Sequence, residues 1–272
     1  MRGFSGLVWA FVRRDFFIAT SYKFSFLFQL VAGIFALAIF HYMSLIMDTG
    51  SMRTTLARFQ TDYFSFVLIG LAGAGFLHTG LTGFSDGLRT GMTEGSLEMT
   101  FSCPVRPVLV LLLPCIWAFS FDALKMVILI GFGSLLFGAH LENANVLGGI
   151  AVIIGMVTSY SVFGILSASI IMVLKKGDPI NAAFGALATL ISGAFFPTEV
   201  LPSWLGSIAK LLPMTYAYEA LRKTLLLGTE IAGVLPELLV LAGFSVVGLP
   251  TVIFVASLAI TKSKRDGTLG IF

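Results

Sequence analysis

The chain has 272 residues, of which 57% are hydrophobic and only 11% are charged, and its formal net charge is +3. Soluble proteins carry about 25% charged residues, so this chain has too few polar side chains to cover a surface that faces water. The mean hydropathy of +0.97 points the same way. This composition excludes a soluble two-domain enzyme, a disordered protein and a nucleic-acid-binding protein, and it predicts an all-α polytopic membrane protein.

Residues 1–23 are predicted to form an N-terminal interfacial helix, separate from a transmembrane domain of residues 24–272. Four apolar side chains recur on one face at helical spacing, and a helix with one apolar face lies in the membrane surface. These side chains are Phe4, Leu7, Val8 and Phe11. Arg14 falls near this face, so a solvated N-terminal tail is the alternative. We expect no cleaved signal peptide, because no small-residue cleavage site follows the first apolar stretch.

Six long stretches with little or no charge predict six transmembrane helices, since about 20 apolar residues cross the hydrocarbon core. Five of them contain no Asp, Glu, Lys or Arg, and the third is interrupted only by Asp122 and Lys125. In chain order the stretches are residues 24–47, 63–85, 108–137, 143–174, 179–198 and 238–261. An even number of spans places both termini on the same side of the membrane.

The distribution of Lys and Arg predicts the orientation, because cytoplasmic loops are enriched in these residues. With six spans, 11 of the 17 Lys and Arg residues fall on the side that holds the termini and five on the other side. The remaining one, Lys125, lies within a span. We therefore expect a multi-pass protein of the cytoplasmic (inner) membrane with both termini in the cytoplasm.

The segment between the fifth and sixth spans, residues 198–236, is too apolar for an ordinary loop. It contains one amphipathic run around Trp204 and a second over residues 216–227. Pro202 and Pro213 stand where these runs begin, and proline is tolerated at a helix start. We expect a short helical hairpin that lies in the outer interface or re-enters the membrane, where protein must cover its backbone.

Two groups of charged residues predict ion pairs. Asp122 and Lys125 are three residues apart near the middle of a span, where each charge alone costs about 2.5–3.5 kcal/mol. We expect them to pair, either as a structural ion pair or as a polar contact for substrate or a dimer interface. Glu219, Arg222 and Lys223 have helical pair spacing in the outer hairpin, and exposed pairs of this kind stabilise by about 0.3–0.5 kcal/mol.

The sequence contains few candidates for catalytic residues. It has no G-x-x-x-x-G-K-[ST] phosphate loop and no G-x-S-x-G motif. His41, His78 and His140 lie on different segments and on both sides of the membrane. Cys103 and Cys115 have no metal-ligand spacing. We expect no catalytic residues, no metal site and no nucleic-acid partner.

Two motifs are more informative. The longest predicted inner loop contains Gly95-Ser96-Leu97-Glu98 followed by Pro104. Near the C-terminus, a second motif is built from glycine, aromatic, proline and arginine residues in a fixed order. Its residues are Gly193, Phe195, Phe196, Pro197, Pro202, Trp204, Pro213, Thr215, Arg222 and Gly228.

These motifs resemble those of the type-2 ABC transporter permeases, the membrane subunits of ABC exporters. That family carries an inner-loop G-[ST]-L-E followed by a proline, and near the C-terminus a glycine, a series of prolines, an arginine and a final glycine in the same order. The resemblance covers nearly the whole chain, and the predicted six spans and inside termini agree with it. The Asp122/Lys125 pair is a departure from the family pattern.

The resemblance implies a transport subunit rather than an enzyme, for an amphiphile such as a lipid-linked glycan, a drug or a lipid. It implies a second permease copy, as a homodimer or with a sister permease, and two separate ATPase subunits. This chain would then bind no cofactor, and ATP and Mg would bind to the partner ATPase. The second motif, including Gly193, Phe195, Phe196, Pro197 and Arg222, would form a mobile outer gate.

We predict that the inner loop couples the permease to its ATPase. Glu94 and Glu98 are four residues apart and project together, Leu97 is an apolar knob beside them, and Gly95 permits a close backbone approach. Such an acidic pair would orient a basic groove of the ATPase more than it would add affinity. The alternative is a solvated acidic loop.

Two other function classes remain open from the sequence. A polytopic membrane enzyme that acts on lipids would need clustered Asp, His or Glu residues at one membrane face. A secondary carrier or ion channel would need several charges within the membrane, and only Asp122 and Lys125 qualify.

Overall fold

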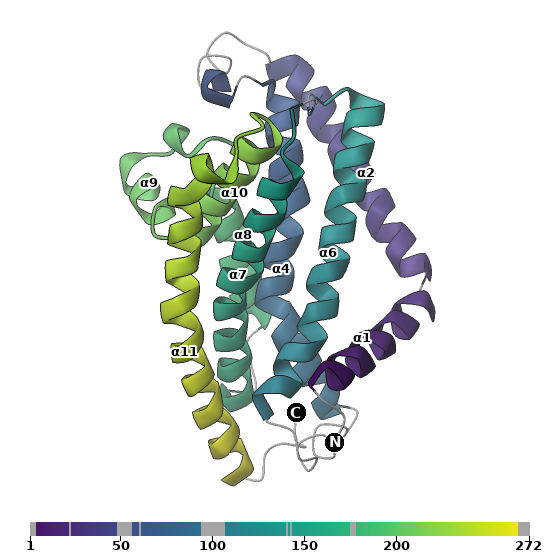
Figure 1. Ribbon diagram of the computed structural model, residues 1–272, viewed down its shortest axis with the longest axis vertical. Coiled ribbons are helices and arrows are strands. Elements are labelled where there is room, and N and C mark those ends of the chain that lie inside the picture. Colours follow the sequence, from purple (N-terminus) through teal and green to yellow (C-terminus); the bar gives the residue numbers. More distant parts are fainter. Residues whose placement is uncertain are drawn as a thin grey trace.

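The computed structural model describes residues 4–21, 23–47, 56–59, 61–93, 107–139, 141, 143–174 and 178–265. Its longer helices form an elongated bundle (Figure 1). In chain order the helical elements are α1 (Phe4–Ser21), α2 (Lys23–Met47), η1 (Ala57–Phe59), α4 (Tyr63–Thr93), α6 (Pro107–Phe137), α7 (Val146–Leu174), α8 (Asp178–Ile191), η2 (Thr198–Val200), α9 (Ser203–Ala209), α10 (Pro213–Leu225), η3 (Ile231–Val234) and α11 (Leu235–Arg265). The described residues contain no strand.

Among the residues that the structure describes, five helical segments are long and apolar enough to cross a membrane, which confirms the predicted all-α polytopic fold. They are Phe26–Ile46, Tyr63–Gly87, Cys115–Phe137, Val146–Val173 and Ile231–Ser263. The chain is therefore a multi-pass membrane protein. The start of α1 and the end of α11 lie at the same end of the bundle (Figure 1).

The fifth predicted span, over residues 179–198, is not one continuous helix of spanning length in the structure. Its helix, α8, has 14 residues and is about 21 Å long at about 1.5 Å per residue, which is less than the roughly 30 Å of the hydrocarbon core. The chain leaves α8 at Ile191 and turns at Gly193, whose φ of +87° is in the left-handed region that favours glycine. The count of six spans therefore stays a prediction.

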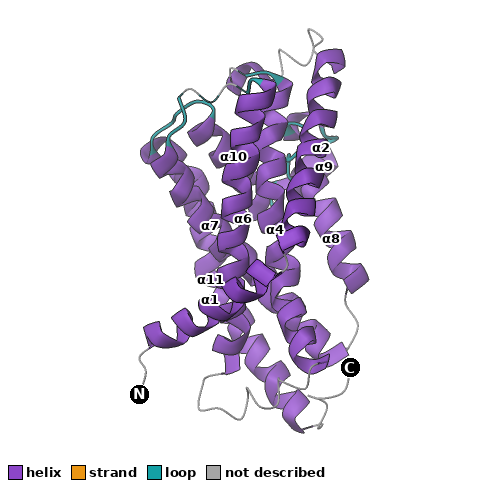
Figure 2. Cartoon of the chain, turned by 90° about the vertical axis from the view of Figure 1, so that its right-hand side faces the viewer, coloured by secondary structure: helices purple, strands orange, loops and turns teal. Residues whose placement is uncertain are grey.

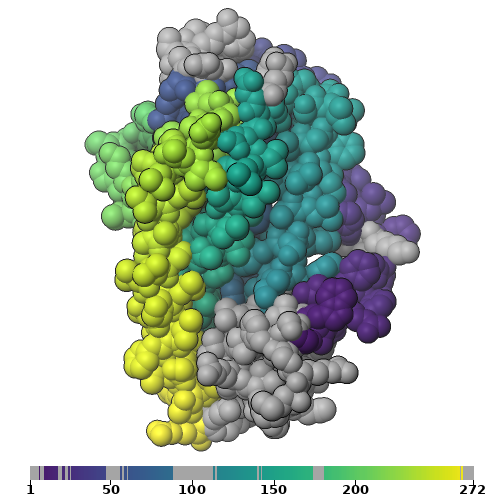
Figure 3. Space-filling view, viewed as in Figure 1, coloured from purple at the N-terminus to yellow at the C-terminus, as the bar shows by residue number. Residues whose placement is uncertain are grey.

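Helix α4 is the central helix of the bundle. Some 72% of its span is buried, against 6% of the span in α2 and 17% of that in α11. It packs between α6 and α7, while α11 packs against α7 and α10 contacts both α7 and α4. On one face of the molecule α11, α7 and α6 follow one another, with α1 and α2 beyond α6 (Figure 3).

Glycine allows α4 and α7 to approach closely. A Cβ atom at Gly164 of α7 would collide with the backbone oxygen of Gly80 on α4 and with the ring of Phe84. A Cβ atom at Gly80 would lie 2.8 Å from the Cβ of Tyr160. Small residues at such contacts favour helix association in membranes, because they allow backbones to pack directly.

Helix α1 runs across the long axis of the other helices (Figure 2). Its contact with the bundle is aromatic, because Phe16 meets Trp117 of α6 edge to face with ring centroids 5.8 Å apart. Trp9 and Phe17 are exposed on it. The helix forms where the sequence predicts it, while its interfacial location and the division at residue 23 stay predictions.

Two short helices, α9 and α10, stand where the sequence predicts an outer hairpin. Pro202 is the N-cap of α9 and Pro213 is the first residue of α10. Helix α9 exposes Trp204. Helix α10 is different, because nine of its 13 residues are buried. The sequence leaves two placements open, a hairpin in the interface and a re-entrant hairpin whose backbone is covered by protein. The burial of α10 fits the second.

The α4–α7 contact can be tested by Gly164→Ala. In an exposed helix this change stabilises by up to about 1 kcal/mol, but here the new methyl group meets backbone that cannot move aside, and overpacking costs about 1–3 kcal/mol. We expect a lower thermal unfolding midpoint in detergent. Gly243→Ala on α11, where no atom lies within 4 Å of the new Cβ, is the matched control. An equal midpoint for both variants would contradict the close packing.

Candidate functional site

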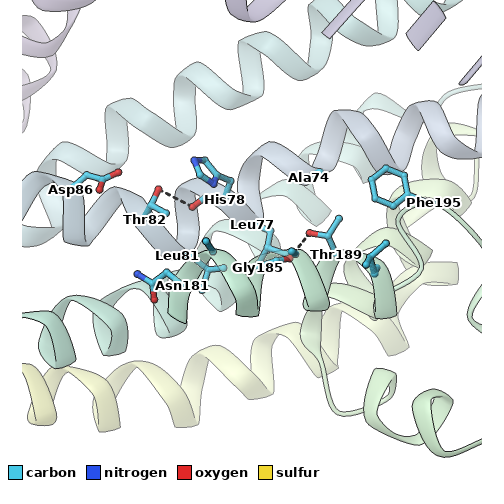
Figure 4. A pocket seen from close by; sticks show the side chains of 13 residues that line it. Ala74, Leu77, His78, Leu81, Thr82, Asp86, Asn181, Gly185, Thr189 and Phe195 are labelled. Carbon is cyan, nitrogen blue, oxygen red and sulfur yellow. Dashed lines mark hydrogen bonds between the residues drawn. The ribbon is translucent and has the colours of Figure 1, made fainter. Parts of the chain in front are cut away.

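A groove with a volume of about 820 Å³ runs between α4 and α8. Helix α4 lines one wall and α8 the other, and Phe195 closes one end (Figure 4). The wall residues are mostly apolar, and they are Ala74, Leu77, His78, Leu81, Thr82, Asp86, Asn181, Ala182, Gly185, Ala186, Thr189 and Leu190. We call this feature the α4–α8 groove.

Polar side chains form a line along each wall of the groove. On α4, His78, Thr82 and Asp86 follow one another at intervals of four residues, which places them on one helix face. On α8, Asn181 and Thr189 are eight residues apart and lie on the facing side (Figure 4). A largely apolar cleft with a few polar groups is the usual character of a binding site for a small molecule.

Several of these polar groups are already engaged within the protein. The Thr82 hydroxyl donates to the His78 carbonyl at 3.1 Å, and the Thr189 hydroxyl donates to the Gly185 carbonyl at 2.7 Å. Asn181 donates from Nδ2 to the Ser167 hydroxyl on α7 at 2.6 Å. This last bond joins the start of α8 to the bundle.

A contact with α2 holds Phe195 at one end of the groove. Its ring stacks on Phe40 of α2, with centroids 5.5 Å apart and an interplanar angle of 10°. Stacked aromatic pairs contribute about 0.5–1.5 kcal/mol beyond their burial. Helix α2 therefore contributes to the groove although little of its span is buried.

The turn before Phe195 is fixed by a buried arginine. Arg222 of α10 is 3% exposed, and its Nη2 atom donates to the carbonyls of Gly193 at 2.7 Å and Ala194 at 2.9 Å. Its Nε atom donates to the Phe66 carbonyl on α4 at 3.3 Å. The guanidinium also lies 3.5 Å from the centroid of the Phe66 ring. One side chain thus joins α10, the turn after α8 and the start of α4.

This arginine stays charged despite its burial. Burial lowers the pKa of the Arg222 guanidinium to about 9, which is still above neutral pH. Hydrogen bonds from a charged donor are roughly twice as strong as neutral ones. Gly70 of α4 completes the arrangement, because a Cβ atom there would collide with the Ala194 carbonyl that Arg222 binds.

The prediction that Arg222 belongs to an exposed ion pair is wrong. Its side chain points into the core, where carbonyl groups accept its hydrogen bonds, while its neighbour Lys223 forms the ion pairs. Lys223 Nζ lies 2.6 Å from Glu237 of α11 and 3.5 Å from Glu219. Burial lowers the pKa of Lys223, but the hydrogen bond to Glu237 and the charge of Glu219 outweigh burial and raise it overall.

The Asp122 and Lys125 side chains form the predicted ion pair, with Nζ 2.6 Å from Oδ1. Asp122 is 3% exposed. A Cβ atom at Gly75 of α4 would lie 3.4 Å from Oδ1, so the glycine leaves room for the carboxylate. The ammonium is 5.4 Å from the centroid of the Phe121 ring. Neither residue lines the α4–α8 groove, which favours a structural pair over a substrate contact.

The structure brings only part of the predicted site together. Gly193, Phe195 and Arg222 form one unit at the end of the groove, Phe196 and Pro197 follow it, and Pro202, Trp204 and Pro213 belong to α9 and α10. The predicted coupling residues Glu94, Gly95, Leu97 and Glu98 lie outside the described residues. The groove residues His78, Thr82, Asn181 and Thr189 were not predicted. Their spacing at multiples of four within apolar stretches is the signal that points to them.

Comparison with known protein families gives a match over most of the chain. The model of the ABC-2 type transporter family matches residues 6–226, which include nearly all of α1, the groove and Arg222. A search of curated proteins found no match.

The anchoring role of Arg222 can be tested by Arg222→Met. The change removes a charged donor from three buried carbonyls, and hydrogen bonds to charged groups contribute about 1.5–3 kcal/mol each, so we expect a loss of roughly 3 kcal/mol or more in unfolding free energy. The measurement is unfolding in mixed micelles. Arg58→Met is the control, because its half-exposed ion pair with Glu199 should be worth at most about 1 kcal/mol. Equal losses would show that Arg222 does not anchor the turn.

The Asp122–Lys125 pair predicts a difference between single and double variants. Asp122→Leu leaves Lys125 without its counter-charge within the membrane, and breaking a buried pair costs about 3–5 kcal/mol. The double variant Asp122→Leu/Lys125→Leu removes both charges, so we expect near-normal thermal stability, assembly and transport. Loss of transport with normal assembly in the double variant would instead assign the pair to substrate or to an interface between permeases.

Proposed function

The chain belongs to the ABC-2 type transporter family, and from this we propose that it is the transmembrane permease of an ABC exporter for an amphiphile in the cytoplasmic membrane. Lipid-linked glycans, drugs and lipids are the substrates of this kind. The termini would lie in the cytoplasm, on the side where Lys and Arg are most frequent.

The observation that carries the proposal is the α4–α8 groove. Its volume of about 820 Å³ is within the range of about 300–1,000 Å³ for pockets that hold small molecules. Its apolar walls suit an acyl or prenyl chain, and its lines of polar groups suit a head group that moves along the helices. A second permease copy packed against this face would turn the groove into a passage between the two chains.

The energy for transport would come from a separate subunit. The sequence has no phosphate loop, so we assign ATP and Mg binding to two copies of a partner ATPase. The contact is proposed to be the inner loop with Glu94, Gly95, Leu97 and Glu98, since it is the longest inner connection. Helix α1 starts near the end of the bundle where α4 ends and α6 begins (Figure 1), so it would flank this contact.

The outer gate is proposed to move at α9 rather than at Gly193. The carbonyl of Gly193 is bound by Arg222, and α10 is largely buried, so both belong to the fixed part of the bundle. Helix α9 is short and exposes Trp204. Movement of the segment from Phe196 to α9 would change access to the end of the groove, while Phe195 and the contacts of Arg222 stay in place.

The proposal is tested by blocking the groove in the reconstituted complex. Ala186 is exposed in the wall of the groove, so Ala186→Trp fills space that a substrate needs. We expect the variant to assemble with the ATPase and to lose at least about 90% of substrate-stimulated ATPase activity and transport, by steric exclusion.

The matched control is Ala242→Trp, at an exposed position of α11 that does not line the groove. It should retain stimulation and transport. Full activity in Ala186→Trp would place the passage elsewhere. Failure of any ATPase to co-purify with the wild-type chain, together with transport that needs no ATP, would overturn the assignment as an ABC permease.

A further inference from the structure

The hydrogen-bonding capacity of the α4–α8 groove is not balanced between donors and acceptors. A threonine hydroxyl has one donor and two acceptor lone pairs. The hydroxyls of Thr82 and Thr189 each donate their one hydrogen bond to a carbonyl of their own helix, at 3.1 and 2.7 Å. Each hydroxyl therefore faces the groove with acceptor capacity, and a ligand that needs a donor from it must first break that bond.

The other polar groups of the groove strengthen this imbalance. Asn181 gives one amide hydrogen to Ser167, which leaves one amide hydrogen and the acceptor Oδ1. The Asp86 carboxylate only accepts, whatever other contacts it makes. Neutral His78 offers one donor and one acceptor. Acceptors thus outnumber donors along both walls, and the described lining residues include no Lys or Arg.

This arrangement is unfavourable for an anionic head group. A phosphate or sulfate brings acceptors and negative charge, and proteins bind such groups with arginine, lysine or backbone N–H donors. In the α4–α8 groove it would meet the threonine hydroxyl oxygens and the amide oxygen of Asn181 instead. Leaving polar groups unpaired on both sides of a contact costs more than the contact gains.

Resting on the function proposed above, we propose that the groove selects amphiphiles whose head group donates hydrogen bonds, as an ammonium or a polyhydroxyl group does. The donors of the head group meet Thr82 and Thr189 on opposite walls, and its chain lies against the leucine and alanine side chains between them. Because the groove selects hydrogen-bond donors, a positively charged head group without N–H groups is not sufficient for preferred binding.

The test compares four dodecyl probes on the full-length chain in lipid nanodiscs. Dodecylammonium carries charge and donors, dodecyl glucoside has donors only, dodecyltrimethylammonium has charge only, and dodecyl sulfate is an anionic acceptor. Each competes with a dodecylamine that carries a photoreactive diazirine on its chain, and mass spectrometry maps the cross-link. We expect cross-links on α4 and α8, and competition by the two donor probes that is about tenfold stronger, the effect of one or two hydrogen bonds.

The relative strength of the two donor probes distinguishes the source of the donors. Stronger dodecylammonium points to an amine-bearing substrate, and stronger dodecyl glucoside to a sugar-bearing one. Equal competition by dodecyltrimethylammonium and dodecylammonium would overturn the proposal, because charge alone would then suffice. Dodecyl sulfate competing as well as the donor probes would overturn it too, as would cross-links confined to other helices.

Variants identify the acceptors directly. Thr82→Val/Thr189→Val keeps the shape of both side chains and removes both hydroxyls, so we expect the preference for donor probes to fall threefold to tenfold, to about the level of simple partitioning. Thr251→Val is the matched control, since Thr251 is exposed on α11 and bonds a carbonyl of its own helix in the same way. An unchanged preference in the double variant would contradict the proposal.

A measurement on the complex separates this inference from the function itself. If the donor probes bind the groove but never stimulate the co-purified ATPase, the result contradicts the proposed exporter function and supports the proposed selectivity. If dodecyl sulfate stimulates ATPase activity and is transported as well as dodecylammonium, the exporter function stands and the selectivity fails.

Discussion

The arrangement of the site depends on one buried guanidinium. Arg222 supplies charged donors to the carbonyls of Gly193, Ala194 and Phe66, which belong to the turn after α8 and to the start of α4. A planar guanidinium has several donors in fixed directions and is more weakly hydrated than an ammonium, so it suits a buried position among carbonyls. Because it fixes the turn, it also fixes Phe195, the stacking on Phe40 and one end of the α4–α8 groove.

The groove exists because α8 covers α4 only in part. Glycines let α4 pack directly on α7, whereas α8 is short and is tied at its start by Asn181 and after its end by the turn that Arg222 holds. The wall between these two attachments is lined by small and aliphatic side chains. The same two attachments therefore hold α8 beside α4 and leave open space between them.

The spans could be predicted from sequence because the absence of charge is a local property. The end of α8 could not, since it depends on Arg222, which is 29 residues from Gly193. Likewise, the positions of the charges alone do not tell the cation at position 222 from that at 223, although one turns into the core and the other pairs with Glu237. The groove threonines share a helix face with a second polar residue of their own helix, but only the facing of α4 and α8 gives the two sets a common surface.

Arg222 also sets the order in which the chain can acquire its structure. Its partner Phe66 lies 156 residues earlier, so α4, α6, α7 and α8 have all been synthesised before this arginine is added to the chain. Chains are synthesised and begin to fold from the N-terminus. A nascent chain that stops before residue 222 can insert its early helices, yet the end of α8 has no charged partner to hold it. Biogenesis of the groove is therefore completed late, by the C-terminal part of the chain.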